Sequence, residues 1–436
     1  MKIMAHRMNL ALRMLLMSLC FWAVPSFAVA AEDALKQEVT ALYDQSLDQL
    51  FKHFHANPEL SFVEVKTAAR MAEEFSALGY EVHTGIAKTG VVALLRNGAG
   101  PLVMMRADMD ALPVKERSGL PYASQVIQEN IEGQHFPVMH ACGHDVHITS
   151  LIGTARIMAA HKETWSGTLM LIAQPAEEWK DSGAAAMRAA DIEAGKLFAS
   201  RGAAYSAVDS LDIVVPGIGA HGASPHRGRD PIVIGAQIVM ALQTIVAREV
   251  SPREPAVVTV GVFRAGNKRN VIGEEARLEL TVRSDSGQTR TQLLAAIERI
   301  AVNIGRAGGL PESQLPYLEL KGGVPVTENN ADLASQVLKA WSDELGEDIL
   351  VAYEREGMGG EDFPFFTQEP VIPSVYFSVG GTSQARFAAF EAKGQSLPSH
   401  HSPLFQIEPR PAVISGVLGT VVALRSLMQN RKLVGD

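Results

Sequence analysis

The stretch HACGHDVH places five side chains that can bind a metal ion within eight residues: His140, Cys142, His144, Asp145 and His147. A single histidine in such a place is usually a loop or helix-cap residue. The density of the cluster and its cysteine favour a metal site instead. In an extended segment, side chains two positions apart point the same way, so Cys142 and His144 could hold one ion.

Two adjacent carboxylates, Glu177 and Glu178, close the run GTLMLIAQPAEE. A solvated acidic turn before a helix is the ordinary explanation of such a pair. Here the pair follows an apolar strand and is expected at the same sheet edge as the cysteine and histidine cluster. Neighbouring side chains of an extended segment point to opposite sides. One carboxylate could therefore bind a metal ion while the other accepts a proton from water that the metal polarises.

Alternating strands and helices are predicted to position these side chains. Apolar runs at 90–96, 101–107 and 167–173 indicate buried strands, and helical periodicity indicates helices at 64–78 and 148–158. This alternation is typical of an α/β fold with a mostly parallel sheet. Ligands of such sheets bind beyond the carboxyl ends of the strands. RADMDALP, HACGHDVH and QPAEE all fall there.

The pattern changes in the middle of the chain. The strand LDIVVPG, a helix at about 231–247, two further strands and a helix at about 293–304 follow in turn. This order resembles a split βαβ, ferredoxin-like α+β unit. After KGGVPV the strand and helix alternation resumes. We therefore predict a catalytic domain at 33–207 and 322–436, with a second domain at 208–321 inserted into it.

The N-terminus has the features of a secretory signal. Basic residues precede a short apolar run at 14–24, and PSFAVAAED follows with a predicted cleavage site after Ala30. A membrane anchor is the alternative, but the run is too short to cross a bilayer. We expect residues 1–30 to be a signal peptide and the mature chain to be periplasmic or secreted, without membrane attachment. Cleavage removes Cys20 and leaves Cys142 without a disulfide partner.

Composition narrows the function classes. Of the 436 residues, 47% are hydrophobic and 20% are charged, which is typical of a soluble globular protein. The net charge of −9 comes without any basic stripe. A nucleic-acid partner is therefore not expected.

Six motifs occur in order along the chain: RADMDALPV, HACGHDVH, QPAEE, GAHGASPHRGRDPIV, GGEDFPFF and HHSPLF. Together they resemble the M20 metallopeptidase family, above all its amidohydrolase branch of hippurate hydrolases, N-acyl-amino-acid amidohydrolases and auxin-conjugate hydrolases. The resemblance implies a catalytic α/β domain with a lid and dimerisation domain, and a homodimer formed through that lid. It also implies a dinuclear metal centre that cleaves an amide.

The resemblance also assigns roles around the metal. It implies that Cys142, His144, Glu178 and His401 are metal ligands, and that Glu177 is the general base. From the residues alone, the histidine pair in SHHSPLF is a candidate for a distant additional ligand. Histidines near a C-terminus are otherwise usually surface residues.

Further residues of the family motifs are expected around the metal ions without binding them. By resemblance, His221 reaches a partner subunit's active site and stabilises the oxyanion. Asn270 falls near the substrate, although a turn residue is an equal alternative. Glu361 lies in a motif near the site, without an assigned role. Asp108 and Asp110 follow a strand and are expected to orient the ligands, with turn capping as the alternative.

One element of the family pattern is missing. The branch has a strand between QPAEE and the lid that ends in a Leu-His-Val motif, whose histidine binds metal. This chain has no histidine between His161 and His221, and the connection is shortened as if that strand were deleted. Three explanations remain open: a neighbour or water substitutes, the site works with one metal ion, or the protein is inactive.

Two functions follow from these patterns. The first is an exported metal-dependent amidohydrolase of N-acyl amino acids or small peptides, with two divalent ions per subunit, or one if the missing histidine matters. Manganese or zinc is expected, and nickel or cobalt also suits a cysteine, histidine and carboxylate site. The second is a degenerate member that binds metal or a small ligand without turnover. A periplasmic solute carrier is disfavoured, because it has no need of the metal-binding cluster.

Overall fold

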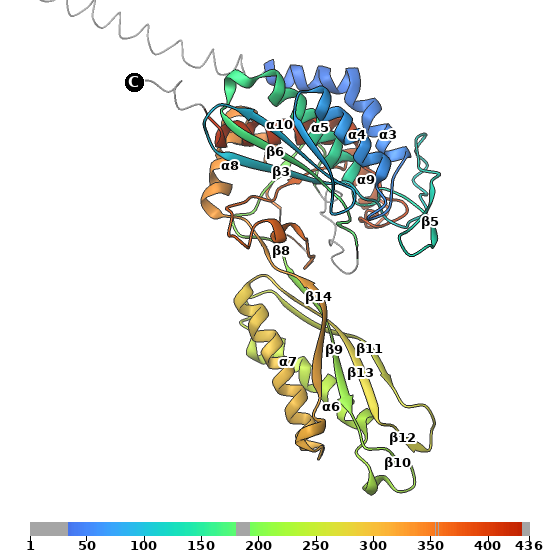
Figure 1. Cartoon of the computed structure of the whole chain (residues 1–436). Helices are drawn as coiled ribbons and strands as arrows, with labels where there is room; N and C mark the ends of the chain where they lie inside the picture. Colours follow the sequence, from blue (N-terminus) through green and yellow to red (C-terminus); the bar gives the residue numbers. More distant parts are fainter. Residues whose placement is uncertain (1–33, 180–191, 354, 356, 430–436) are drawn as a thin grey trace, which may run out of the picture.

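The computed structural model describes residues 34–179, 192–353, 355 and 357–429. The predicted signal peptide and part of the shortened connection lie outside these residues. Figure 1 shows an upper domain of helices around a sheet and a lower domain of one sheet with two long helices. The chain enters the lower domain by β9 and leaves it by β14, so the lower domain is inserted into the upper one.

The sheet of the upper domain has four strands in the order β1-β2-β6-β3. Their bounds are β1 Glu81–Ile86, β2 Gly90–Asn97, β3 Leu102–Asp108 and β6 Gly167–Gln174. The pairs β1–β2 and β2–β6 are antiparallel, and only β3–β6 is parallel. The predicted α/β class is confirmed, but the described sheet is mixed rather than mostly parallel. A three-residue turn joins β1 to β2, and so short a connection permits only antiparallel pairing.

Helices pack on this sheet and on one another. They are α3 Asp48–Ala56, α4 Val65–Ala77, α5 His144–Ala160, α8 Ala331–Leu345, α9 Gln384–Glu391 and α10 Pro409–Leu427. Helix α5 is apolar on nearly all sides, which is typical of a buried helix, and it lies between β3 and α10. Its first residue is His144, so the domain core fixes a candidate metal ligand.

Short strands complete the upper domain. They are β4 Ile127–Glu129, β5 His135–Pro137, β7 Leu197–Phe198, β8 Ala203–Tyr205, β15 Thr327–Glu328 and β16 Ser378–Val379. Strand β7 pairs with β16, and β8 pairs with β15. The described part of the connection between QPAEE and β9 thus forms two small sheets with strands from later in the chain. None of its residues pairs with β3.

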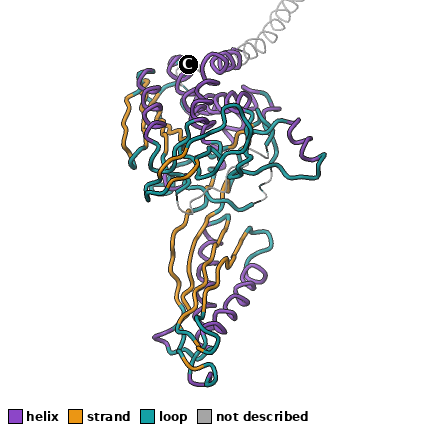
Figure 2. The backbone as a smooth tube through the Cα atoms, turned by 90° about the vertical axis from the view of Figure 1, so that its right-hand side faces the viewer, coloured by secondary structure: helices purple, strands orange, loops and turns teal. Residues whose placement is uncertain are grey.

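The inserted domain is an antiparallel sheet in the order β11-β13-β9-β14. Its elements are β9 Ala207–Pro216, α6 Pro231–Thr244, β11 Ala256–Ala265, β13 Glu275–Ser284, α7 Gly287–Ala307 and β14 Tyr317–Val324. Strand β13 alternates buried and partly exposed residues, as expected of a strand with one face in a core. Figure 2 shows the helices along one side of the sheet. The predicted α+β insertion is confirmed.

Two helical segments are long and apolar enough to cross a membrane by length and composition alone, Pro231–Glu249 and Pro409–Leu427. The first packs on α7 and β13, and the second on α5 and α8. Both therefore serve as core helices of their domains, and they are weak evidence for membrane insertion.

Candidate metal centre

Two groups of three possible ligands meet where β3, β6 and α5 converge. One comprises Cys142, Glu178 and His401, and the other comprises His144, Glu177 and Glu178. Within each group, the ligand atoms all lie within 4.8 Å of one another. Glu178 belongs to both groups, so one carboxylate can serve two neighbouring ion positions.

Cys142 and His144 lie in different groups, whereas the extended segment predicted that they could hold one ion together. The segment is not extended as that prediction assumed. Gly143 between them has a left-handed backbone with φ 91°, and α5 begins at His144. A glycine adopts this conformation readily, and it turns the two side chains apart.

The two glutamates also differ from the predicted arrangement of opposite-facing neighbours. Ala176 has φ 57°, so the backbone after β6 turns instead of continuing extended. Both carboxylates consequently lie near one imidazole, with Glu177 Oε2 at 3.8 Å and Glu178 Oε1 at 3.9 Å from His144 Nε2. The Ala176 N–H donates to buried Glu64 Oε1 at 2.8 Å, which stabilises this turn.

Asp110 contacts both ligand-bearing segments. Its carboxylate accepts from the Glu178 N–H at 3.0 Å and from the Ser61 hydroxyl at 2.6 Å. Its backbone carbonyl lies 2.8 Å from His144 Nδ1. A carbonyl can only accept, so Nδ1 carries the proton and Nε2 is left to face an ion. These contacts are those of a residue that orients ligands.

Asp108 lies between two imidazoles. Its Oδ1 is 2.6 Å from His147 Nδ1 and 3.7 Å from His144 Nε2. The three residues form a further group whose ligand atoms lie within 4.8 Å. Asp108 thus lies beside His144, and the same group of three residues could bind an ion.

His401 comes to the site from the far end of the chain. Its N–H donates to the Ala141 carbonyl at 2.8 Å, which ties its loop to the HACGHDVH segment. Its Nε2 lies 3.2 Å from Glu178 Oε1. Its side chain is 37% exposed, whereas Glu178 is 2% exposed, so His401 lies on the solvent side of the centre.

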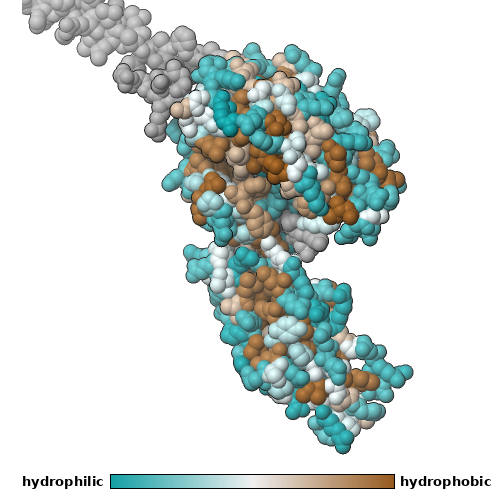
Figure 3. Space-filling view, viewed as in Figure 1, coloured by the Kyte–Doolittle hydropathy of each residue, from teal (hydrophilic) through white to brown (hydrophobic). Residues whose placement is uncertain are grey.

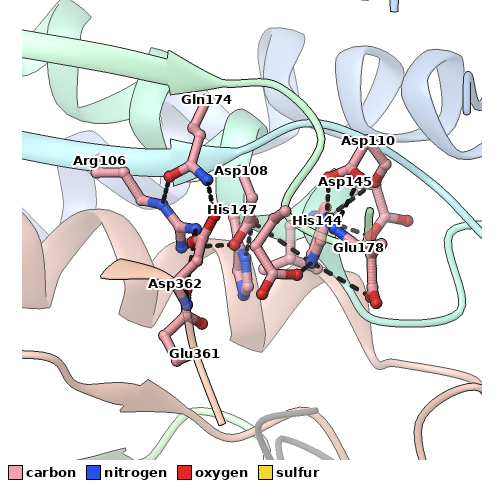
Figure 4. A network of polar contacts seen from close by, with 12 residues as sticks. Arg106, Asp108, Asp110, His144, Asp145, His147, Gln174, Glu178, Glu361 and Asp362 are labelled. Atoms are coloured by element: carbon pink, nitrogen blue, oxygen red, sulfur yellow. Dashed lines mark hydrogen bonds and ion pairs between the residues drawn. The ribbon is translucent and has the colours of Figure 1, made fainter. Parts of the chain in front are cut away.

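A buried arginine, which sequence reasoning missed, holds the acidic wall of the site together. Arg106 donates to Gln174 at 2.7 Å, Asp108 at 2.7 Å, Glu361 at 3.0 Å and Asp362 at 2.9 Å. Figure 4 shows its guanidinium pointing into this carboxylate network. A basic residue that ends the apolar run PLVMM was the available signal, since buried arginines are almost always paired.

The charges of the site favour a bound cation. Burial lowers the pKa of His144, but the Asp108 carboxylate and the Asp110 contacts outweigh it and raise that pKa to about 10. Burial and the Glu178 and Glu177 carboxylates raise the pKa of the Cys142 thiol well above its ordinary value. Thiol, imidazole and carboxylate donors in an acidic, buried place fit divalent transition metals. The residues present therefore suit the metal ions that the motifs imply.

The other members of HACGHDVH lie behind the centre. Asp145 Oδ2 is 2.7 Å from His55 Nδ1, and His55 Nε2 is 3.1 Å from Glu116. Burial lowers the pKa of His55, yet these two acids outweigh it and raise that pKa to about 9. Burial lowers the pKa of His140 to about 4. This charged pairing fixes the loop that carries Cys142.

The remaining predicted residues divide between the two domains. Glu361 accepts from the Tyr376 hydroxyl at 2.8 Å and groups with Glu177 at the centre. His221 ends the two-residue strand β10, and Asn270 precedes β12 Val271–Ile272, with which β10 pairs. Figure 1 shows this pair at the far tip of the inserted domain. Within one chain, these two residues lie away from the metal centre.

Comparison with known proteins agrees with this geometry. The model of peptidase family M20/M25/M40 matches residues 104–391. A hippurate hydrolase of Campylobacter jejuni is 36% identical over 74% of this chain and 85% of its own. A thermostable carboxypeptidase of Saccharolobus solfataricus is 35% identical over 85% of this chain and 92% of its own.

A solved structure is also similar. It is a Bacillus subtilis protein described as a dinuclear metal-binding peptidase from the M20 family, with 26% identity and a TM-score of 0.68. The match covers 88% of this chain and 98% of that one. The resemblance seen in the motifs is thereby confirmed. The chain belongs to peptidase family M20/M25/M40 and is a metal-dependent hydrolase of amide bonds.

Proposed function

We propose that the protein is an exported amidohydrolase that cleaves N-acyl amino acids or small peptides, with Glu177 as the general base. The observation that carries this proposal is the pair of ligand groups joined through Glu178, the second of which also contains Glu177. When bound, divalent ions at these groups polarise the amide carbonyl and lower the pKa of water. Manganese or zinc suits the donors, and two ions per chain match the two groups.

Glu177 is placed to move protons. Its carboxylate is fully buried, lies 3.8 Å from His144 Nε2 and also forms a group of possible ligands with Glu361 and Asp362. In the proposed reaction it accepts a proton from the attacking water and later delivers it to the departing nitrogen. Cys142, His144, Glu178 and His401 hold the ions, and Asp108 and Asp110 orient these ligands.

A homodimer formed through the inserted domain is part of this proposal. Strand β11 is an edge of the described sheet, and α6 exposes Val233 and Met240 by 53% and 72%. Figure 3 shows such apolar side chains on the surface of the lower domain. An open edge beside apolar side chains is suited to a second copy. His221 of one copy could then reach the other copy's centre and donate to the developing oxyanion.

Light scattering tests the dimer directly. We expect the purified chain to have the mass of two subunits, and Met240→Asp to shift it toward one subunit because a buried charge would oppose association. The matched exposed substitution Leu102→Asp, in the upper domain, should leave the dimer mass unchanged. A wild-type mass of one subunit at micromolar concentration would contradict the dimer.

Export is inferred from the N-terminal pattern, with its basic residues, apolar run and Ala28-Val29-Ala30 site. The mature chain would begin at Ala31 and act in the periplasm or outside the cell. Mass spectrometry of the protein from a native host measures that end. A chain that retains residues 1–30 in a cytoplasmic fraction would contradict export.

Metal removal tests the function. We expect the protein to release free amino acid from an N-benzoyl or N-acetyl amino acid, and a chelator to lower that rate at least about a hundredfold. Added manganese or zinc should restore it. Chromatography of the released amino acid gives the rate.

The same assay separates the alternative of a degenerate binding protein. The relatives do not favour that alternative, because the matched proteins carry the names of hydrolases and peptidases. Bound metal without turnover on any N-acyl amino acid or dipeptide would support it and contradict our proposal. Hydrolysis at full rate in chelator would contradict both.

A further inference from the structure

The outer edge of β3 has no strand partner among the described residues. Strand β3 is the last of the order β1-β2-β6-β3, and its one partner is β6. Strands β7 and β8, which follow QPAEE along the described chain, pair with β16 and β15 instead. The space beside this edge is therefore bounded by side chains of β3, α5, α10 and the segment before β16.

A cavity of about 120 Å³ lies beside this edge. Its wall is mainly apolar. The apolar side chains come from β3, α5 and the segment 363–379: Met105, Val146, Phe363, Val375, Phe377 and Val379. Figure 3 shows apolar side chains gathered on the upper domain around the place where Figure 1 draws β3 and β6. A cavity with this lining suits an apolar group.

Two residues of the cavity wall also contact groups at the metal centre. His147 lines the cavity, and its ring stacks on His144 with centroids 5.5 Å apart. Tyr376 also lines it, and its hydroxyl donates to Glu361 at 2.8 Å. The same side chains thus face both the cavity and the catalytic groups. A substrate whose amide lies at the centre can extend a substituent into the cavity.

The cavity wall also carries a polar group without a hydrogen-bond partner among the described residues. Ser150 lines the cavity from α5, is 9% exposed, and its hydroxyl makes no hydrogen bond to the described residues. Ser150 lies six positions after His144 on the same helix, which corresponds to about 9 Å along the axis. A buried hydroxyl without a partner is costly. It points to an occupant that is mainly apolar and can accept or donate one hydrogen bond.

The size of the cavity limits the occupant. An apolar protein cavity of about 150 Å³ binds benzene, and 120 Å³ is close to that volume. The cavity therefore has room for one aromatic ring or a short aliphatic chain, and a long fatty acyl chain exceeds it. We propose that it is the acyl subsite, which takes the aromatic ring or short apolar chain of an N-acyl amino acid. This inference rests on the proposed function.

Filling the cavity from one wall tests the proposal. Val379→Phe adds a ring at one position of the cavity wall, and Val375→Phe adds one at a second position in case the first variant folds poorly. We expect either change to lower the ratio of kcat/KM for an N-benzoyl substrate to that for its N-acetyl counterpart at least tenfold. Leu102→Phe is the matched control, because Leu102 is 62% exposed on β3 and does not line the cavity. It should leave the ratio unchanged.

A binding measurement on chelator-treated protein separates this proposal from the proposed function. Fluorine NMR would follow 4-fluorophenol, a ring with one hydroxyl, bound to wild type and to the three variants. We expect binding to wild type and to Leu102→Phe, and at least tenfold weaker binding to a folded Val379→Phe or Val375→Phe. Binding with this pattern but no hydrolysis would overturn the proposed function and leave an aromatic site. Equal binding to all four proteins, or an unchanged substrate ratio in an active enzyme, would overturn the acyl subsite.

Discussion

Glu177→Gln is expected to lower kcat by about a thousandfold, within the range that a positioned general base contributes. Glutamine keeps the size of the side chain but cannot accept a proton. Glu177 is fully buried, with its carboxylate 3.8 Å from His144 Nε2, so no solvent group can easily take its place. Steady-state release of amino acid from an N-acyl substrate gives kcat, and the metal content of the same sample should match that of wild type.

A matched substitution separates this effect from a general loss of charge. Glu254→Gln makes the same chemical change at an exposed position of the inserted domain, and kcat should stay within about twofold of wild type because surface changes are usually mild. If Glu177→Gln retained kcat within threefold of wild type with its metal bound, Glu177 would not be the base. A loss of metal together with activity would instead assign Glu177 a ligand role.

The metal-binding residue types could be predicted from the sequence because they are rare in such density. Cys142 and His144 lie two positions apart in one motif, and Glu178 follows a clear apolar strand. Their grouping could not be predicted, because it depends on backbone turns at Gly143 and Ala176. Alternation rules assume an extended chain. A residue with a left-handed backbone conformation changes which side chains meet. In the sequence, glycine is the residue that indicates such a conformation, and Ala176 gives no such signal.

The relative direction of paired strands also could not be predicted from the sequence. Apolar runs correctly located β2, β3 and β6, but a run of apolar residues is compatible with either direction of pairing. The direction of pairing is set by the connections between the strands. A tight turn makes β1 and β2 antiparallel, and the crossover through α5 makes β3 and β6 parallel. The role of Arg106 was missed for a related reason. Its acidic partners Glu361 and Asp362 are more than 250 residues away in the chain.

Glu178→Ala is expected to abolish tight metal binding at both of the ligand groups that share Glu178. Glu178 is the one residue shared by the Cys142–His401 group and the His144–Glu177 group. His401→Ala removes a ligand from only one group. We therefore expect about two metal equivalents in wild type, about one in His401→Ala and close to none in Glu178→Ala after dialysis. Elemental analysis of the dialysed proteins measures these values.

Folding must be separated from ligation in this comparison. The Asp110 carboxylate accepts from the backbone N–H of Glu178, so alanine at 178 keeps that hydrogen bond and the turn it holds. Circular dichroism of the chelator-treated proteins should accordingly be the same for wild type, His401→Ala and Glu178→Ala. Equal metal loss in the two variants would show that the ions bind cooperatively as a pair. Full retention in Glu178→Ala would mean that the ions lie elsewhere, and the shared carboxylate would lose its assigned role.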